Sequence, residues 1–352
     1  MLYPLIFEPV LKEKIWGGDA LYRKYGIELP SSNIGESWNI ASHENGMSVV
    51  ADGHLKGKTL EELIELYDEE FLGTALSPEH SSKFPLLIKL LDATDILSVQ
   101  VHPDDDYAAV YEDGELGKTE MWYIIDAKPG ASLVYGIEPG TTKEEFKRSI
   151  EEGNLEKYLK KLKVEPGDVL YMPAGMVHAI GAGILICEIQ QNSDTTYRVY
   201  DWNRVGQDGR PRALHIDKAL DVIDFEGEYD REKLEGLTVD ENGARRTYYI
   251  ATEYFAIEKL EIESQFSDST DGSKFYTLSV MEGSGRIEYN GDSITFCGGQ
   301  SILIPASLGK YRIVGDCVLI KAYVPEVEKD IIKPLLDRGY DKAKLSTIVG
   351  IQ

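Results

Sequence analysis

Apolar and polar residues alternate along much of this chain with the two-residue period of half-buried β-strands. The segment 84–93, FPLLIKLLDA, is a buried strand-like run whose only charged residue before its end is Lys89. The segment 97–102 and the aromatic and β-branched run at 119–125 continue this pattern. From about residue 251 the chain is again rich in strand-like runs, separated by tight GSG and NG turns. The pattern predicts a protein that is mainly β.

Two helical segments are expected to interrupt the strands. In 56–72, apolar residues recur at helical spacing behind Thr59, which is a suitable N-cap. In 140–163, capping threonines and acidic first-turn residues predict two helices in succession. The C-terminus also has a helical pattern. We therefore expect an N-terminal domain over 1–250 with helical insertions, and a C-terminal β-domain over 251–352 that ends in a helix.

An internal repeat relates the two halves of the chain. Gly167–Ala174 (GDVLYMPA) is echoed by Gly299–Ala306 (GQSILIPA), and extending the match without a gap aligns His178 with Lys310. The repeat predicts two barrels of similar build, the second without the histidine and without a metal. The alternative is a chance similarity between two strand–proline turns.

The charge of the chain narrows the choice of partners. The 352 residues include 37 Lys and Arg against 61 Asp and Glu, which gives a formal net charge of −24. Nucleic acids and anionic membranes need a basic surface, so neither is an expected partner. A phosphorylated metabolite remains possible, because a few cations in one pocket suffice to bind it. The sequence contains no feature that indicates an oligomeric state.

The N-terminus and the cysteines indicate the cellular compartment in which the protein is expected. Glu8 interrupts the first apolar run, and no run of 18 apolar residues follows, so neither a signal peptide nor a membrane span is expected. Cys187, Cys297 and Cys317 are odd in number and lie in apolar strand-like runs. They are interpreted as buried thiols in a reducing compartment, which predicts a cytoplasmic protein.

Candidate metal ligands occur at strand spacing. Gln100 and His102 are two residues apart, so their side chains point to the same face of a strand, and Lys118 and Glu120 repeat this spacing. His178 follows a strand and a Pro/Gly turn that would return the chain antiparallel. One amide oxygen, two imidazoles and a carboxylate could thus converge inside a β-barrel. Zn²⁺ is favoured among divalent metals because imidazole is a softer ligand than oxygen.

Each assignment has a structural alternative. A single histidine in a strand is usually a core or surface group, and it is the joint spacing that favours ligation of a metal. Gln100 is the weakest candidate, because an amide oxygen binds zinc weakly. Asp104–Asp106 resemble a metal cluster, but after His-Pro a solvated turn and a helix N-terminus are favoured. The four tryptophans are more typical of a core than of a sugar platform.

Longer motifs carry a family resemblance. Gly167-x5-Pro173-x-Gly175-x2-His178 is similar to the second motif of the cupin superfamily, whereas the first motif is only half present, as Gln100-x-His102. Together with WGG, GESW, FPLLIKLLDA, QVHPDD, GKTEMWYI and SDTTYRVYDW, these motifs resemble the short bacterial form of type I mannose-6-phosphate isomerases. The resemblance is detailed from Trp16 to about Trp202 and looser thereafter.

The resemblance implies a fold and a set of functional residues. The implied fold has two cupin-like jelly-roll β-barrels, the first metal-binding and catalytic, the second degenerate. One zinc ion per chain would be bound by four side chains: Gln100, His102, Glu120 and His178. The implied catalytic residues are Arg198, Lys118 and Glu188. The implied substrate-binding residues are Lys89, Asp194 and Arg204.

The implied reaction interconverts mannose 6-phosphate and fructose 6-phosphate through an enediol. This chemistry needs an electrophile at the substrate oxygens, a base that moves a proton between C1 and C2, and cations for the phosphate. Arg198 offers a planar charged fork for phosphate or enediolate. A nearby dication would make Lys118 a usable base at neutral pH, and Glu188 is the other candidate base.

Two departures from longer family members leave the substrate contacts open. Ile180 stands where those members have an aromatic residue, and a larger helical insertion is missing. The alternatives are therefore a cupin isomerase for another sugar phosphate, such as glucose 6-phosphate, and a non-catalytic bicupin that binds sugar or metal.

Overall fold

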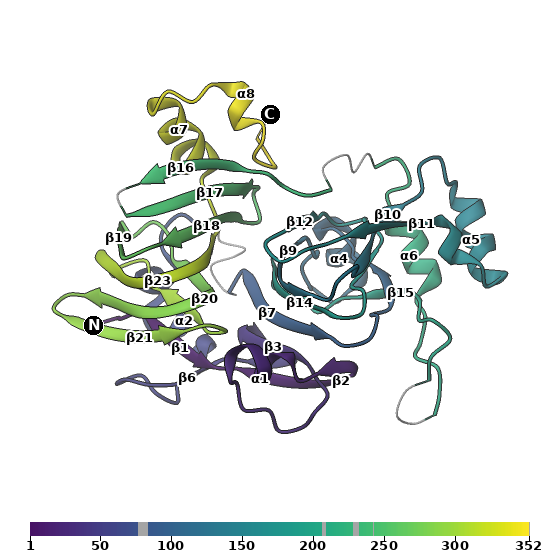
Figure 1. Cartoon of the computed structure of the whole chain (residues 1–352), viewed down its shortest axis with the longest axis horizontal. Coiled ribbons are helices and arrows are strands. Elements are labelled where there is room, and N and C mark those ends of the chain that lie inside the picture. The colour runs from purple at the N-terminus through teal and green to yellow at the C-terminus, as the bar shows by residue number, and fades with distance from the viewer. Residues whose placement is uncertain (77–83, 206–208, 228–231, 242, 352) are drawn as a thin grey trace.

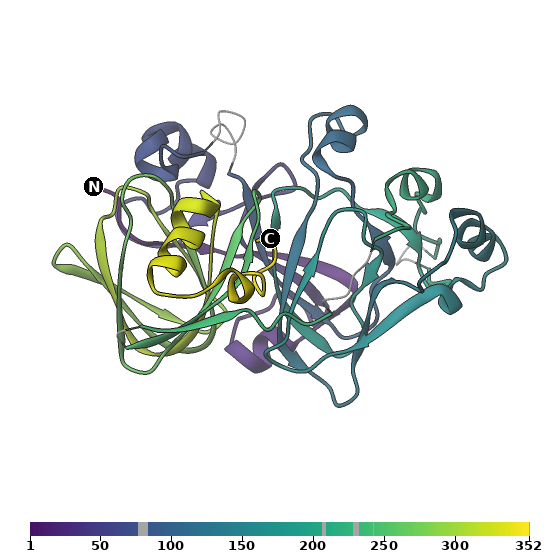
Figure 2. The same ribbon diagram turned by 90° about the horizontal axis from the view of Figure 1, so that it is seen from above.

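The computed structural model describes residues 1–76, 84–205, 209–227, 232–241 and 243–351. Two strand-rich halves lie side by side, with short helices at their outer edges (Figures 1 and 2). The predicted class, mainly β with helical insertions, is confirmed. No helix in the described ranges has the length and apolar character needed to cross a membrane.

The half that carries the predicted ligands consists of two antiparallel sheets. The first has the strand order β12-β9-β14-β7-β3-β2. In that order the strands span Val169–Met172, Glu120–Ala127, Ile184–Gln191, Leu86–Ala93, Ile34–Ile40 and Val10–Gly18. The second sheet has the order β11-β10-β13-β8-β15. Its strands span Leu159–Lys163, Ser132–Ile137, His178–Ala179, Val99–Val101 and Tyr197–Tyr200.

Strand β7 explains why the central strands have nearly continuous apolar sequences. Ile88 and Leu90 on one face pack into a core that extends into the C-terminal half. Leu91 and Ala93 on the other face pack into the core of the N-terminal half. Because both faces are covered, both must be apolar. Lys89, on the second face, is only 3% exposed and points between the two sheets.

The other half is one large antiparallel sheet. Its main path is β16-β17-β18-β23-β20-β22-β1-β6, with β19 paired to β23 and β21 paired to β20. Along the path the strands span Leu237–Glu241, Ala244–Ala251, Ala256–Ile262, Lys310–Tyr323, Tyr276–Tyr289, Ser301–Ile304, Leu5–Glu8 and Val49–Val50. Strand β19 spans Gln265–Ser269 and β21 spans Asp292–Cys297. A separate hairpin pairs β4, Ser42–His43, with β5, Gly46–Met47.

Strand pairing does not follow the predicted division at residue 250. Strands β1 and β6 from the N-terminus join the sheet of the C-terminal half, where Leu5 lies opposite Leu303. Strands β16 and β17 also belong to this sheet, although they precede residue 251. The backbone N–H of Ala306 donates to the carbonyl of Phe71, which ties helix α2 to the same half. Such long-range pairings depend on packing between distant segments and leave no local sequence signal.

The helices are short and peripheral. The α-helices are α1 Ala20–Tyr25, α2 Leu60–Leu72, α4 Asp105–Tyr111, α5 Lys143–Glu151, α6 Ile216–Val222, α7 Lys333–Asp337 and α8 Lys342–Leu345. A 3₁₀-helix, η1, spans Leu155–Tyr158, and a π-helix, η2, spans Glu328–Ile332. Thr59 caps α2 through a capping box, as expected. Asp104 caps α4 by accepting from the N–H of Tyr107, so the helix interpretation of the acidic run is confirmed.

Two local predictions are wrong. The last residues of the predicted helical segment 140–163 form strand β11, because pairing with β10 overrides the helix propensity of its Leu and Lys residues. Cys187 and Cys317 are buried free thiols, whereas Cys297 is exposed. On β21, Phe296 points into the core, so the adjacent Cys297 must point outward.

Both copies of the internal repeat have the same local structure. Gly167 and Gly299 have φ of 94° and 85° in the turns that precede β12 and β22, and each of these strands leads through a second turn into β13 or β23. The gapless alignment is nevertheless one residue out of step. His178 is 1% exposed, whereas Lys310 is exposed and the next residue, Tyr311, is buried. Tyr311 therefore takes the inward place of His178, one residue further from the end of the preceding strand.

Candidate metal centre

Neighbouring strands of the five-stranded sheet bring several predicted residues together. His178 on β13 lies opposite Gln100 on β8, and Arg198 on β15 lies opposite Gln100 from the other side. His102 follows Gln100 by two residues, so its side chain turns toward the same face. Three strands that are distant in sequence thus present an amide, two imidazoles and a guanidinium on one surface.

The six-stranded sheet faces them with a second row of polar side chains. Glu120 on β9 lies opposite Gln190 on β14. Glu188, also on β14, lies opposite Lys89 on one neighbouring strand and Trp122 on the other. All five side chains are buried, so the charges among them must be balanced within the protein.

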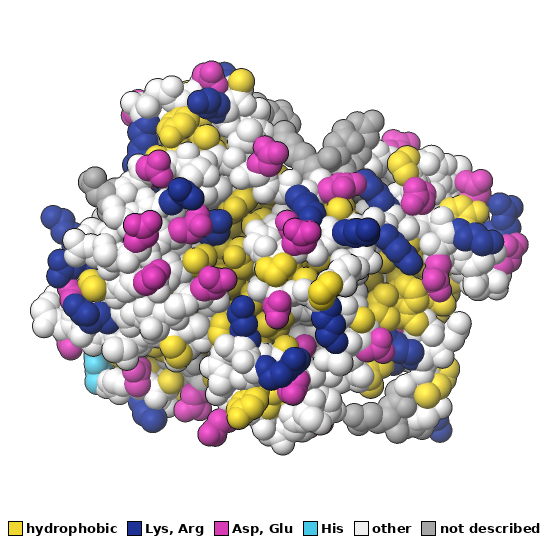
Figure 3. All heavy atoms as spheres, viewed as in Figure 1, with side chains coloured by type: hydrophobic (Ala, Val, Ile, Leu, Met, Phe, Trp, Pro, Cys, Tyr) yellow, Lys and Arg dark blue, Asp and Glu magenta, His cyan; other side chains and the backbone are white. Residues whose placement is uncertain are grey.

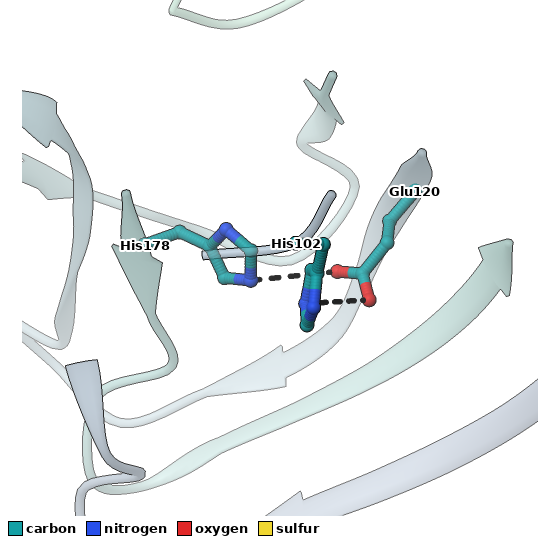
Figure 4. Close-up of side chains that lie close together, drawn as sticks. All are labelled: His102, Glu120 and His178. Atoms are coloured by element: carbon teal, nitrogen blue, oxygen red, sulfur yellow. Dashed lines mark ion pairs between the residues drawn. The ribbon is translucent and has the colours of Figure 1, made fainter. Parts of the chain in front are cut away.

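His102, Glu120 and His178 converge from the two sheets (Figure 4). Nε2 of His102 lies 3.3 Å from Oε1 of Glu120, and Nε2 of His178 lies 3.7 Å from Oε2. One ligand atom of each residue lies within 4.8 Å of the other two. Bonds of about 2.0–2.2 Å to a tetrahedral zinc ion place its ligand atoms about 3.3 Å apart. The spacing of the three side chains therefore suits a single metal ion.

Backbone carbonyls orient both imidazoles. Nδ1 of His102 lies 2.8 Å from the carbonyl oxygen of Thr195, and Nδ1 of His178 lies 2.9 Å from that of Met176. A carbonyl oxygen only accepts, so each Nδ1 carries the proton. Each Nε2 consequently presents a lone pair to the centre, as metal-binding histidines do.

Lone pairs at the centre face one another without a donor between them. Nε2 of His102 is buried and has no hydrogen-bond partner, while the Oε1 of Glu120 that it faces is paired with Nζ of Lys118 at 3.0 Å. Burial, together with the positive charge of Lys118, lowers the pKa of His102 to about 3, so a proton does not bridge the two atoms near neutral pH. Two such acceptors at 3.3 Å repel each other unless a cation lies between them. The chemistry of this donor set therefore fits a bound metal ion.

Gln100 lies beside the three-residue cluster. Its Nε2 is 3.4 Å from Nε2 of His178, which is the nitrogen that carries the lone pair. A half turn of the side-chain amide exchanges its nitrogen and oxygen and directs the oxygen toward the centre. Ligation by Gln100 stays a prediction.

Lys118 is held next to the centre by carboxylates. Its Nζ lies 3.0 Å from Oε1 of Glu120. Burial lowers the pKa of Lys118, but Glu120, Glu188 and Asp194 raise it by more, and the net pKa lies above the usual value. The prediction that Lys118 is a base at neutral pH therefore requires a dication that offsets these carboxylates.

The pKa of Glu188 is also shifted upward, but burial is the main cause. Burial, followed by the negative charge of Glu120, raises the pKa of Glu188, while Lys89 and Lys118 oppose that rise. Nζ of Lys89 lies 3.2 Å from Oε1 of Glu188 and donates to Oε1 of Gln190 at 2.7 Å. Glu188 is thus a buried carboxylate with an increased affinity for a proton.

A pocket of about 320 Å³ opens beside the cluster. Predicted site residues account for six of its lining side chains: Lys89, Gln100, Lys118, Glu188, Asp194 and Arg198. The remaining lining residues are Lys14, Trp16, Glu36, Leu91, Leu97, Ser98, Thr196 and Arg212. The face shown in Figure 3 has basic and acidic side chains intermingled. Lysine and arginine side chains are therefore concentrated in this pocket, whereas on the face shown in Figure 3 they are mixed with acidic side chains.

Arg204 is placed differently from the other predicted residues. It does not line the pocket and instead donates to Asp201 and to the carbonyl of Ile96. Arg212 lines the pocket and is held by two hydrogen bonds from its Nε and Nη2 to Asp201, at 2.7 and 2.6 Å. Sequence reasoning missed Arg212 because it follows an irregular loop, where no periodicity indicates which way a side chain points.

Two family profiles match separate parts of this chain. The family profile "Phosphomannose isomerase type I, catalytic domain" matches residues 5–127, and "Mannose-6-phosphate isomerase, cupin domain" matches residues 245–324. The mannose-6-phosphate isomerase ManA of Bacillus subtilis is 43% identical over 90% of this chain and 98% of its own length. The chain belongs to the type I mannose-6-phosphate isomerase family. The Streptococcus mutans mannose-6-phosphate isomerase is 40% identical over 93% of this chain and all of its own length.

Solved structures of this isomerase family agree with the fold. The crystal structure of the mannose 6-phosphate isomerase from Bacillus subtilis superposes with a TM-score of 0.84 at 40% identity, covering 91% of this chain and 99% of that one. A phosphomannose isomerase variant from Salmonella typhimurium, 16% identical with a TM-score of 0.76, shows the likeness of fold alone. The catalytic-domain match contains Glu120 but ends before His178. It is the fold that brings His178 to the centre.

Proposed function

We propose that this chain is a zinc-dependent isomerase that interconverts mannose 6-phosphate and fructose 6-phosphate, acting in the cytoplasm. The observation that carries the proposal is the buried His102–Glu120–His178 cluster beside an arginine-lined pocket. Membership in the mannose-6-phosphate isomerase family supports the substrate and the reaction. Two imidazoles and a carboxylate, with Gln100 as a fourth donor, are ligands that suit zinc.

Arg198 is the candidate for phosphate binding. Its Nε donates to Ser98 Oγ and one Nη donates to the carbonyl of Ala213. Within the described part of the chain, no carboxylate pairs with Arg198. Burial and the neighbouring charge of Arg212 lower its pKa, which means that the two cations are held close together at an energetic cost. A phosphate dianion between Arg198 and Arg212 would remove that repulsion.

The reacting end of the sugar would then lie toward the histidine cluster. His102, Glu120 and His178 would hold the metal, which would supply electrophilic stabilisation of the substrate oxygens. Glu188 would take the proton from C2 of the open-chain aldose and return it to C1, while the hydroxyl proton of O2 passes to O1, since the raised pKa of Glu188 favours accepting a proton. Lys118, an ammonium under the influence of its carboxylates, would donate hydrogen bonds to the enediol oxygens. Lys89 and Asp194 would bind sugar hydroxyls.

Metal dependence provides the first test. The purified protein is treated with a chelator, dialysed and assayed in both directions, alone and after addition of zinc or another divalent metal. We expect activity to be lost with the metal and restored by zinc to one ion per chain. Full activity in a preparation shown to be metal-free would contradict the proposal. Glucose 6-phosphate in the same assay distinguishes an isomerase for another sugar phosphate.

Two arginine variants locate the phosphate site. Arg212→Ala is expected to raise KM for mannose 6-phosphate by about 10- to 100-fold, because a hydrogen bond to a charged group contributes about 1.5–3 kcal/mol. Arg204→Ala is the matched variant, since Arg204 binds the same Asp201 but does not line the pocket. A larger effect of Arg204→Ala would favour the predicted role of Arg204 over that of Arg212.

A further inference from the structure

Trp122 connects two carboxylates of the site through a single N–H group. Its Nε1 lies 3.1 Å from Oε2 of Glu120 and 3.0 Å from Oε2 of Glu188. Trp122 is completely buried, so water does not replace these hydrogen bonds. Its ring also meets the imidazole of His178 edge-on, with ring centroids 5.3 Å apart. One side chain thus touches two residues of the three-residue metal cluster and the carboxylate proposed as the base.

The two oxygens of each carboxylate have separate partners. Oε1 of Glu120 faces Lys118 and His102, and Oε1 of Glu188 faces Lys89. Both Oε2 atoms accept from the indole N–H of Trp122, and Oε2 of Glu120 also lies 3.7 Å from Nε2 of His178. With Oε2 of Glu120 held in this way, Oε1 is the oxygen that faces Nε2 of His102 at 3.3 Å and Nζ of Lys118 at 3.0 Å. The indole therefore fixes the rotation of the Glu120 carboxylate, and with it the direction in which Oε1 points.

The hydrogen bond also lies between two negative charges. Glu120 and Glu188 are both buried, and the charge of Glu120 contributes to the raised pKa of Glu188. A donor shared by the two carboxylates reduces their repulsion and fixes the rotation of each. Without it, Glu188 would keep only Lys89 as a strong partner and would be free to turn away from the pocket.

The C-terminal half lacks this tryptophan. In β9, Trp122 lies opposite Leu170 of the first repeat copy, and in β20, Leu278 lies opposite Ile302 of the second. Leu170 and Ile302 are equivalent in the repeat, so Leu278 occupies the position of Trp122. The half without the histidine cluster thus has an apolar residue at this position.

We propose that Trp122 is a positioning residue that orients Glu120 toward the metal and Glu188 toward the substrate with one shared N–H. This inference rests on the proposed metal-dependent function and adds a residue that acts through others. Outer hydrogen-bond partners of metal ligands typically contribute 10- to 100-fold to metal affinity. Loss of the N–H should therefore weaken metal binding and slow the proton transfer separately.

The test replaces Trp122 while preserving its shape. Trp122→Phe removes the N–H together with part of the ring. β-(3-Benzothienyl)alanine at position 122 replaces only the N–H by sulfur, so it preserves the shape of the side chain and serves as the second variant if Trp122→Phe does not fold. Zinc dissociation constants are measured by competition with a chromophoric chelator, and kcat and KM are measured at saturating zinc. We expect a zinc dissociation constant at least about tenfold higher. We also expect a kcat about tenfold lower with little change in KM.

Trp38→Phe is the matched control. Trp38 is also fully buried in the six-stranded sheet and donates its indole N–H to Oε2 of Glu36 at 2.7 Å, away from the cluster. Both phenylalanine variants should lower the Tm, but only Trp122→Phe should weaken zinc binding. Equal zinc affinities in the two variants, or in the parent and the sulfur analogue, would overturn the inference. A parent that binds zinc but isomerises no sugar phosphate would instead contradict the proposed function, while the affinity comparison would still test Trp122.

Discussion

The two halves of the molecule place charges at the same strand positions but with opposite sign. In the N-terminal half, Glu188 lies opposite Lys89 on the neighbouring strand. In the C-terminal half, Lys321 lies opposite Glu258 at the equivalent position. One strand further along, Trp38 lies opposite Lys89 and Tyr248 lies opposite Glu258. The register therefore identifies Lys321 as the counterpart of Glu188.

The inverted charge gives Lys321 an acidic neighbour and an aromatic one. Nζ of Lys321 lies 2.7 Å from Oδ2 of Asp268 and 3.6 Å from the ring centroid of Tyr276. Asp268 lies opposite Tyr311, as Gln100 lies opposite His178. The C-terminal half thus places a lysine where the N-terminal half has Glu188, and the cations of the N-terminal half, Lys89 and Lys118, are paired with Glu188 and Glu120.

The comparison shows how one scaffold serves two purposes. A cation covalently attached to the chain balances buried acceptors permanently and leaves no coordination position for a ligand. An exchangeable metal ion balances them while keeping a position for substrate oxygens. The C-terminal half has the larger hollow, about 1060 Å³, but within the described residues the only cluster of His, Cys, Asp or Glu spaced for a metal is His102, Glu120 and His178.

The strongest test of this comparison replaces the inward residue of each half in turn. His178→Ala removes a proposed ligand, and we expect zinc affinity to fall by more than about 100-fold, beyond the effect of losing an outer partner, with loss of isomerase activity. Tyr311→Phe, at the equivalent position, should retain one zinc ion per chain and normal activity. Zinc content after dialysis and a coupled isomerase assay provide the measurements. Retention of stoichiometric zinc in His178→Ala would refute the ligand assignment.

A smaller effect, on stability, is expected from Lys321→Met. This change leaves Asp268, whose side chain is 16% exposed, without its nearest counter-charge, and because breaking a fully buried pair typically costs about 3–5 kcal/mol of unfolding free energy, we expect a cost at the lower end of that range. Lys310→Met is the matched control, because Lys310 is exposed and should change stability by no more than about 0.5 kcal/mol. Urea unfolding measures both. If Lys321 acts only as a counter-charge, adding Asp268→Asn should restore most of the lost stability while zinc content stays unchanged.

The smallest predicted effect is a pH dependence in the C-terminal half. Burial raises the pKa of Asp268, but Lys321 and Arg246 lower it by more, from 3.8 to about 2. A carboxyl group whose pKa is lower in the folded state stabilises the protein above pH 3.8, and this contribution disappears as the pH falls to about 2. It amounts to about 2 kcal/mol. Asp268→Asn should therefore show a shallower loss of stability than the parent when urea unfolding is measured between these pH values, and identical slopes would contradict the assignment.

The sequence indicated which side chains share a face, but it did not indicate the course of the chain. Gln100, His102 and Glu120 lie on or next to strands, where a period of two residues determines which side chains share a face. The repeat correctly indicated two similar strand–turn units. Its alignment failed at Lys310, because one extra residue before the inward position moves every following side chain to the other face. Arg212 was missed for a related reason, since irregular chain has no period.

Local pattern by itself determined that the protein is mainly β, where its buried strands and capped helices lie, and which residues are candidate ligands. Only the tertiary structure decided that β1 joins the C-terminal sheet, that residues 159–163 form a strand, and that Trp122 lies between Glu120 and Glu188. Hydrophobic periodicity reports the burial of one segment against an unspecified partner. The identity of that partner, and hence which charges meet in the interior, depends on contacts between segments that are far apart in the chain.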